Sequence, residues 1–231
     1  MNVLAIIVAA GQGVRMGAGR PKAFLRLGGL TLLERSLAAF LSHPRVDRVV
    51  AAVPDPDEAR RLLGPSADRV VLVRGGATRQ ESVRSALQAA TSAEDEIILV
   101  HDAARPLVPR AIIDAVIASA QKSGAAIPGL VPPDTIKQVD EEGAAVATLP
   151  RDRLRLAQTP QGFRGDVLRD AYSRAERDGF TGTDDAALVE RTGHLVVFVE
   201  GSQRNIKITT PGDLALAEAM LAGETEGGHG A

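Results

Sequence analysis

The sequence predicts an α/β protein with a parallel, doubly wound sheet, and two observations carry this prediction. Short apolar runs rich in Val and Ile alternate along the chain with stretches whose apolar residues recur at helical spacing. Several of those helical stretches begin with a recognisable capping motif. Because β-α-β alternation joins neighbouring strands through crossover helices, it is typical of a parallel sheet that carries helices on both faces.

The predicted strands are short, apolar and rich in β-branched residues, as expected of strands buried on both faces. They cover residues 3–8, 48–53, 69–73, 96–100 and 195–199.

The predicted helices have local start signals. Thr31 with Glu34, and Thr78 with Glu81, form capping boxes ahead of apolar helical faces. Pro109 suits the first position of a third helix. The remaining helices are expected over residues 166–177 and 184–192 and after Thr210-Pro211.

The alternation changes near residue 130. Two short strand-like runs, residues 136–139 and 144–149, flank a polar run at 140–143 and predict a β-hairpin. We therefore expect one domain over residues 1–222, with a projecting hairpin arm at about 134–155. A flexible, Gly-rich tail is expected over residues 223–231.

Composition excludes several function classes. The net charge of −2 gives no electrostatic attraction for nucleic acid or an anionic membrane. With no Trp and one Tyr, the chain lacks the aromatic residues on which single-stranded bases stack. The absence of Cys removes disulfides, zinc–thiolate sites and cysteine nucleophiles. The N-terminal apolar run is too short for a signal peptide or a membrane span, so we expect a cytoplasmic protein.

The first candidate binding segment follows the first predicted strand. Ala10, Gly11 and Gly13 form a turn with little side-chain bulk, which lets backbone N–H groups approach phosphate oxygens. Arg15 and Lys22 follow as cations that can bind phosphate. The alternative is a flexible strand-to-helix turn, but the coupling of the turn to two cations favours a nucleotide triphosphate site.

Two better-known nucleotide motifs do not fit this turn. A dinucleotide-binding fingerprint needs a third glycine where the chain has Met16, and this disfavours an NAD-binding oxidoreductase. A Walker-A loop fails because no Gly-Lys-Ser/Thr run follows the glycines.

A second candidate segment lies after the third predicted strand. Gly75 and Gly76 precede a capped helix whose first turn carries Arg79 and Ser82. Helix N-termini favour anions, and small residues ahead of them admit a ligand. A plain strand–turn–helix junction with a solvated Arg79 explains this segment equally well.

Further polar residues follow the fourth predicted strand. Asp102 has the oxygen ligands that Mg²⁺ prefers, although a helix cap is a serious alternative. Arg105 can face a second anion. His101 shares no metal-ligand spacing with the other histidines, and we interpret it as structural.

Two segments in the last quarter of the chain also carry polar residues at predicted element ends. For the run at 183–185, helix capping is a sufficient explanation. Lys207 stands between Ile206 and Ile208, so it must either extend to solvent or meet an anion.

Taken together, these segments resemble the 2-C-methyl-D-erythritol 4-phosphate cytidylyltransferases of the non-mevalonate isoprenoid pathway. The resemblance runs from about residue 3 to residue 221 through AAGxGxRM…PK, GGxxRxxSV, VHDAARP, TPQ, TDDA and NIKIT. Many sugar-nucleotide transferases share the first motif, whereas VHDAARP followed by TPQ and NIKIT is narrower. Ribitol-phosphate cytidylyltransferases are close relatives and give the main rival substrate.

The resemblance implies a Rossmann-like nucleotidyltransferase fold whose mostly parallel sheet carries helices on both faces and a β-hairpin arm. It implies an Mg²⁺-dependent transfer of the cytidylyl group from CTP to methylerythritol phosphate, with release of pyrophosphate. Arg15, Lys22 and Lys207 would be catalytic and Asp102 would bind the metal. Ala10, Gly11, Gly13, Gly76 and Ser82 would bind the nucleotide. Arg105, Thr135, Arg151 and Thr159 would line the acceptor side.

The resemblance also implies a homodimer whose arms interlock, with Arg151 reaching into the partner's site. In some bacteria such a domain is fused to a cyclodiphosphate synthase, and we expect this chain to be either a stand-alone enzyme or part of a longer one. From a different class, a catalytically silent nucleotide-binding subunit would be favoured by loss of Lys22 or Asp102, and both are present.

Overall fold

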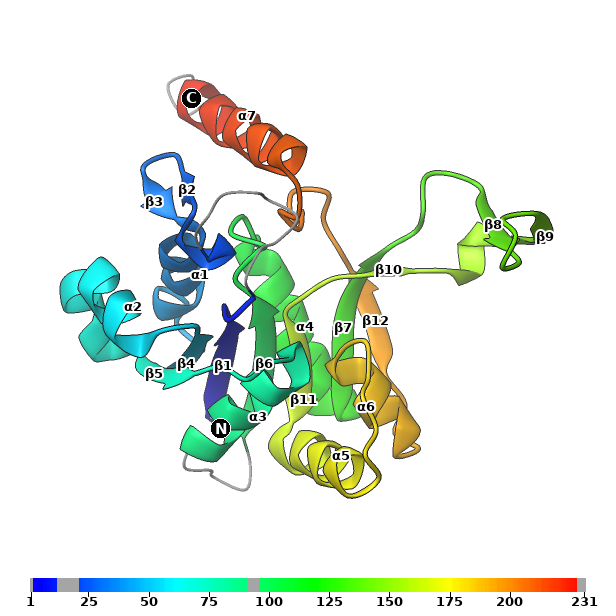
Figure 1. Ribbon diagram of the computed structural model, residues 1–231, viewed down its shortest axis with the longest axis horizontal. Coiled ribbons are helices and arrows are strands. Elements are labelled where there is room, and N and C mark those ends of the chain that lie inside the picture. Colours follow the sequence, from blue (N-terminus) through cyan, green and yellow to red (C-terminus); the bar gives the residue numbers. More distant parts are fainter. Residues whose placement is uncertain (1, 12–20, 91–95, 228–231) are drawn as a thin grey trace.

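The computed structural model describes residues 2–11, 21–90 and 96–227. Within these residues, an eight-stranded mixed sheet forms the centre of the molecule (Figure 1). The strand order is β10-β7-β11-β6-β1-β4-β5, and β12 also pairs with β7. The predicted class, a mostly parallel sheet with helices on both faces, is confirmed.

The parallel half of the sheet follows the sequence prediction closely. It consists of β1 (Val3–Val8), β4 (Arg48–Val53), β5 (Val71–Arg74) and β6 (Ile97–Asp102). β1 pairs in parallel with both β4 and β6, and β4 pairs in parallel with β5. The predicted bounds of β1 and β4 are confirmed. β6 runs past its predicted end at residue 100, so His101 and Asp102 belong to the strand itself.

The other half of the sheet contains strands that the sequence pattern did not predict. These are β7 (Ala125–Leu130), β10 (Leu156–Ala157) and β11 (Gln161–Arg164). β11 is antiparallel to both β6 and β7, whereas β12 (Val197–Glu200) is parallel to β7. β7 contains Pro128 and Gly129, residue types that argue against a strand, and β11 is only four residues long.

Helices cover both faces of the sheet. One face carries α1 (Leu32–Leu41), α2 (Pro56–Leu63) and α4 (Arg110–Ser123). The opposite face carries α3 (Arg79–Ala89), α5 (Gly165–Arg177) and α6 (Asp185–Arg191). Side chains of β1 alternate between the two cores: Ala5 and Ile7 face the first group of helices, and Leu4 and Ile6 face the second. This burial on both faces explains why β1 is apolar throughout.

Local capping signals set the helix starts. Both predicted capping boxes are formed, one by Thr31 with Glu34 and the other by Thr78 with Glu81. The prediction for Pro109 was wrong by one position, because Pro109 is the N-cap and α4 begins at Arg110. Asp184 is the side-chain N-cap of α6 and accepts a hydrogen bond from the backbone N–H of Ala187.

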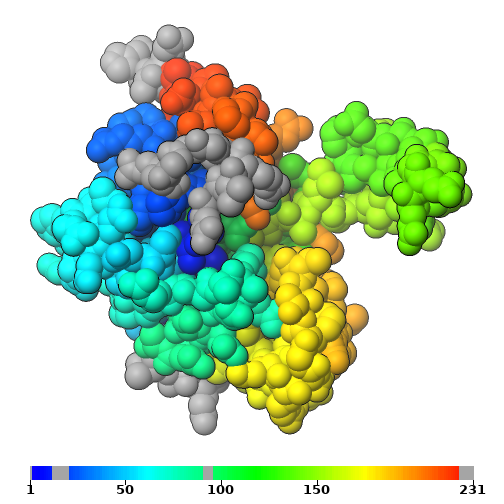
Figure 2. Space-filling view, in the orientation of Figure 1, coloured from blue at the N-terminus to red at the C-terminus, as the bar shows by residue number. Residues whose placement is uncertain are grey.

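The hairpin arm is formed by β8 (Ile136–Val139) and β9 (Ala145–Leu149). Figures 1 and 2 show it standing away from the body of the molecule. At its tip, the Asp140 carboxylate accepts hydrogen bonds from two backbone N–H groups, and Gly143 adopts φ +86°. A short 3₁₀ helix, η4 (Arg151–Arg153), leads back to β10.

The last helix packs beside the small sheet of β2 (Arg26–Leu27) and β3 (Leu30–Thr31). It is α7 (Pro211–Gly227), which continues past residue 222, where the predicted domain ends. Its Ala217 joins a small apolar cluster with Leu27, Leu32 and Ile208. The described part of the chain holds no helix with the length and apolar character needed to cross a bilayer.

Candidate active site

A cavity of about 310 Å³ opens at the carboxyl ends of β1 and β6. In open α/β sheets, this edge is where ligands bind. Its walls come from residues 8–11, 76–79 and 102–104, together with Lys22, Ala23, Leu32, Ser82 and Lys207. Of the predicted nucleotide-binding residues, Ala10, Gly11, Gly76 and Ser82 line it. Gly13 and Arg15, also predicted for this site, lie outside the described residues.

The wall between β5 and α3 is tightly packed. A Cβ atom on Gly75 would overlap with Cβ of Ala10 and would lie 2.9 Å from Oγ of Ser82. The Ser82 hydroxyl donates to the carbonyl of Thr78 at 2.9 Å and accepts from the N–H of Gly76 at 3.1 Å. Because the hydroxyl bonds to both residues, Ser82 fixes the loop ahead of α3 as well as lining the cavity.

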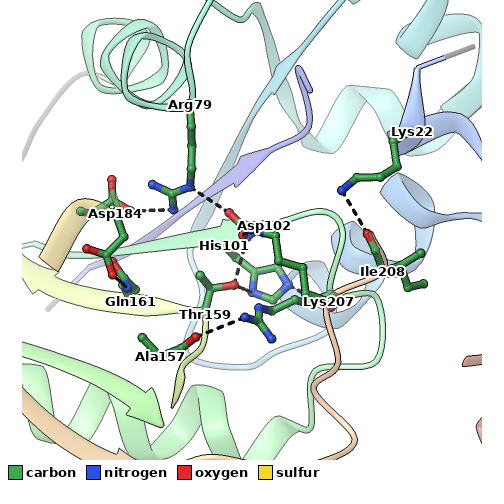
Figure 3. A network of polar contacts seen from close by, with 12 residues as sticks. Lys22, Arg79, His101, Asp102, Ala157, Thr159, Gln161, Asp184, Lys207 and Ile208 are labelled. Carbon is green, nitrogen blue, oxygen red and sulfur yellow. Dashed lines mark hydrogen bonds and ion pairs between the residues drawn. The ribbon is translucent and has the colours of Figure 1, made fainter. Parts of the chain in front are cut away.

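Asp102 stands between two cations. Nζ of Lys207 lies 2.6 Å from its Oδ2, and Nε of Arg79 lies 3.0 Å from its Oδ1 (Figure 3). Burial opposes ionisation of this carboxyl, but the charges of Arg79 and Lys207 outweigh it and hold the pKa of Asp102 well below its ordinary value. The sequence left two alternatives for Lys207, extension to solvent or contact with an anion. The structure shows contact with an anion, the carboxylate of Asp102.

Arg79 was not among the predicted site residues, and it is not the solvated side chain of a plain junction. Its Nη2 lies 2.7 Å from Oδ2 of Asp185, on the side away from Asp102. Burial lowers the pKa of this guanidinium, but the two carboxylates more than offset that effect and raise it well above its usual range. Part of the signal is present in the sequence, as an arginine in the first turn of a capped helix after two glycines.

Lys22, the other predicted catalytic lysine, also lines the cavity. It begins the 3₁₀ helix η2 (Lys22–Phe24), which follows Pro21. Its Nζ donates to the carbonyl of Ile208 at 3.0 Å (Figure 3). Since Ile208 directly follows Lys207, both predicted catalytic lysines are held by one stretch of chain.

His101 is buried and serves as a structural residue. Its Nε2 lies 3.1 Å from the carbonyl oxygen of Arg105, which can only accept, so Nε2 carries the proton. Nδ1 of the neutral ring therefore accepts from the hydroxyl of Thr159, also at 3.1 Å. The same hydroxyl oxygen accepts from the backbone N–H of Asp102 at 3.1 Å. Burial lowers the pKa of His101 to about 4, which keeps the ring neutral.

Arg105 and Thr159, two predicted acceptor-side residues, are joined through Asn205. Arg105 donates to the carbonyl of Asn205 at 2.6 Å, and Nδ2 of Asn205 donates to the carbonyl of Thr159 at 2.7 Å. Asn205 is fully buried and was not predicted. Burial lowers the pKa of Arg105, and within the described residues its buried Nε has no hydrogen-bond partner. These contacts bring the TPQ and NIKIT segments together beside Asp102.

The structure does not bring Thr135 and Arg151 to this cavity. Both are exposed at the base of the hairpin arm. Arg151 donates to the carbonyl of Pro133 at 2.6 Å. Neither residue lines the cavity of its own chain. For Arg151 this is expected, because the family resemblance implies a dimer in which Arg151 reaches the partner's site.

Asp102 fits the kind of magnesium site that is shared with a nucleotide. Within the described residues, no group of three or more Asp, Glu or His side chains is arranged to hold a metal alone. Magnesium bound with nucleotides commonly takes one or two protein carboxylates and completes its shell with phosphate oxygens and water. Asp102 can supply that carboxylate, provided that one of its cationic partners gives up an oxygen.

Comparison with known proteins covers nearly the whole chain. A family model described as 2-C-methyl-D-erythritol 4-phosphate cytidylyltransferase matches residues 3–223. The enzyme of that name from Acidobacterium capsulatum is 48% identical over 96% of this chain and 98% of its own length. The bifunctional enzyme IspD/IspF of Nitrobacter winogradskyi is also 48% identical, over 94% of this chain and 55% of that protein.

Solved structures show the same likeness. The crystal structure of 2-C-methyl-D-erythritol 4-phosphate cytidylyltransferase from Thermus thermophilus superposes with a TM-score of 0.81 at 44% identity. The match covers 96% of this chain and 100% of that one. The match therefore extends over nearly the whole chain.

Proposed function

Because the chain belongs to the 2-C-methyl-D-erythritol 4-phosphate cytidylyltransferase family, and is therefore a nucleotidyltransferase enzyme, we propose that it joins CTP to 2-C-methyl-D-erythritol 4-phosphate. The products are 4-(cytidine 5'-diphospho)-2-C-methyl-D-erythritol and pyrophosphate. One observation carries the proposal beyond family membership. Lys22 and Lys207 enter one cavity at the carboxyl edge of the sheet, beside a carboxylate suited to Mg²⁺.

The chemistry needs these cations more than it needs a base. The phosphate of the acceptor is already an anionic nucleophile at neutral pH, and it must approach the α-phosphate of another anion. Catalysis then depends on alignment for in-line attack and on stabilising the charge that builds on the leaving pyrophosphate. In our proposal, Lys22 and Arg15 hold the triphosphate, and Lys207 faces the reacting phosphates.

We propose that Asp102 holds the Mg²⁺ ion. When bound, the ion neutralises charge on the phosphate oxygens. The side chain of Lys207, which pairs with Asp102, is 41% exposed, so this lysine can turn from the carboxylate toward a substrate phosphate. Thr159 and Arg105, fixed by His101 and Asn205, hold the acceptor side of the same site in place.

The shape of the nucleotide wall favours a pyrimidine. Ala10, Gly76 and Ser82 line the cavity, and Gly75 packs so closely against this wall that a Cβ on it would overlap with Cβ of Ala10. We propose that this wall accepts cytosine and excludes the larger purines by lack of space.

We further propose that two copies of the chain pair through the arm. Val139 and Val146 are 54% and 58% exposed on the two strands of the arm, so they offer apolar surface that a second copy can cover. Arg151 and Thr135 at the base of the arm would then complete the acceptor side of the partner's site.

The test is pyrophosphate release with Mg²⁺, using CTP, UTP, ATP and GTP, each with methylerythritol phosphate, ribitol 5-phosphate or no acceptor. Release that occurs only with the pair of CTP and methylerythritol phosphate supports the proposal. Release with CTP plus ribitol 5-phosphate would move the acceptor assignment and leave the nucleotide site as proposed. No release from any pair by folded protein would contradict the proposed activity and support a nucleotide-binding subunit.

A further inference from the structure

The ion pairs around Asp102 continue into the protein interior. Arg79 uses one edge of its guanidinium for Asp102 and another nitrogen for Asp185, as the distances of 3.0 and 2.7 Å show. The hydroxyl of Tyr172 then donates to Oδ1 of Asp185 at 2.6 Å. The chain of contacts therefore runs from α5 through α6 and α3 to the end of β6.

The two cationic partners of Asp102 differ in how firmly they are held. Arg79 is anchored from behind by Asp185, whose side chain has no exposed surface, and is itself 26% exposed. Lys207 is 41% exposed at the end of a flexible four-carbon stem. When Asp102 takes another partner, Lys207 is therefore the side chain that can leave, and Arg79 is the one that stays.

Capping does not explain Asp185. The N-cap of α6 is its neighbour Asp184, whose carboxylate binds the N–H of Ala187 and the side-chain amide of Gln161. Asp185 instead uses both oxygens for Tyr172 and Arg79. Asp185 does not line the cavity, and of its two side-chain partners Arg79 does and Tyr172 does not.

We propose that Arg79, anchored by Asp185, is a positioning residue that holds the Asp102 carboxylate in its metal-binding orientation while Lys207 exchanges with the ion. The planar guanidinium suits this role because it presents separate nitrogens to two carboxylates in one fixed geometry, whereas an ammonium group is a single point of charge on a flexible stem. The inference rests on the proposed function, since it concerns the ion that CTP brings to the site.

The experiment compares Arg79→Lys, Asp185→Asn and Tyr172→Phe with the wild-type protein. The first readout is the Mg²⁺ concentration that gives half-maximal pyrophosphate release at saturating CTP and acceptor. We expect it to rise about 10- to 100-fold for Arg79→Lys and Asp185→Asn, the usual effect of losing a group that orients a metal ligand. Tyr172→Phe removes a more remote contact and should give a smaller rise in the same direction.

The second readout is CTP binding without metal, measured by titration calorimetry in EDTA. If Asp185 acts through Asp102, the affinity of Asp185→Asn for CTP in EDTA should stay within about twofold of the wild-type affinity. A twofold difference is under about 0.5 kcal/mol. An equal loss of CTP affinity with and without metal would overturn the proposal and assign Arg79 a direct phosphate contact.

Arg84→Lys is the matched control. Arg84 lies on the same helix as Arg79 and pairs with Glu176 on the surface, away from Asp102. It should leave the Mg²⁺ requirement unchanged. If folded Arg79→Lys and Asp185→Asn behave like this control, the proposal is wrong. Should Asp185→Asn fail to fold, Arg79→Lys and Tyr172→Phe decide the question by the same two readouts.

The wild-type protein separates this inference from the proposed function. The Mg²⁺ requirement is measured with whichever acceptor the wild type uses, because Asp102 belongs to the nucleotide side of the reaction. Use of a different acceptor would therefore revise the proposed function and leave the prediction for Arg79 standing.

Discussion

Nζ of Lys207 lies 2.6 Å from Oδ2 of Asp102, so the lysine predicted to act on substrate is paired with the carboxylate predicted to hold the metal. The pair joins the last strand-end segment of the chain to β6. Because the side chain of Lys207 is partly exposed and can move away, the charge next to the Asp102 carboxylate can change.

Replacing Lys207 with Gln should lower kcat for pyrophosphate release by about 10²–10³, the usual effect of removing one group that stabilises a developing charge. The measurement is steady-state kinetics at saturating CTP, acceptor and Mg²⁺. Lys122→Gln is the control, since Lys122 is exposed at the end of α4 and away from the cavity. An equal loss in both variants would point to a general charge effect.

Lys22→Ala should cause a loss of similar size, about 10²–10³ in kcat, because Lys22 lines the same cavity as Asp102 and Lys207. The contact of Lys22 with the carbonyl of Ile208 is also lost, so thermal unfolding should accompany the kinetics. A near-wild-type kcat in the folded variant would remove Lys22 from the proposed mechanism.

Gly75→Ala should narrow the nucleotide wall, because its new Cβ would overlap with Cβ of Ala10. Overpacking of this kind costs about 1–3 kcal/mol, and a wall that relieves it by moving into the nucleotide site should raise KM for CTP about 5- to 160-fold. Gly223→Ala is the control, since nothing lies within 4 Å of its added Cβ. If both variants bind CTP as the wild type does, the packed-wall explanation of base choice fails.

The stability of the metal-free protein should fall as the pH drops from 6.5 toward 4. His101 has a folded pKa of about 4 against an ordinary value of 6.5, so between these values the unfolded chain binds more protons than the folded one. The contribution is complete above pH 6.5 and declines by roughly 3 kcal/mol by pH 4. Burial also lowers the pKa of His43, which adds to the loss in the same direction.

Urea unfolding at several pH values in EDTA measures this dependence. His101→Gln should flatten the dependence between pH 6.5 and 4, whereas His194→Gln, at an exposed position, should keep it. An unchanged dependence in folded His101→Gln would mean that other groups produce it.

Charging the arm should separate the proposed dimer. A double variant, Val139→Glu with Val146→Glu, places like charges on the exposed apolar side chains of β8 and β9. Sedimentation should show a shift from dimer to monomer, with loss of activity if Arg151 serves the partner's site. Val71→Glu, on the opposite edge strand β5 and 52% exposed, should leave both properties unchanged. A wild-type protein that sediments as a monomer would contradict the proposal directly.

The sequence predicted those parts of the fold whose signals are local. β1 and β4 are continuous apolar runs, and Thr31 and Thr78 lie three residues from their capping partners, so a short window contains the information. β7 could not be predicted, because Pro128 and Gly129 are tolerated only through its pairing with strands distant in sequence.

The same distinction between local signals and contacts distant in sequence applies to the site. Lys22, Asp102 and Lys207 were predicted from their motifs, and the structure brings them to one cavity. The contact between Arg79 and Asp185 spans 106 residues, and no pattern near either residue indicates it. Asn205 was missed for a similar reason, since its partners lie in the TPQ segment.

The order in which the site is assembled follows from the contacts of the segment at 205–208. The N–H of Ile208 binds the carbonyl of Ala104, its own carbonyl receives Lys22, and Lys207 meets Asp102. A ribosome synthesises this segment after β12, the last strand of the sheet. A chain that stopped before residue 205 would therefore contain every strand of the described sheet, yet it would lack both Lys207 and the carbonyl that holds Lys22.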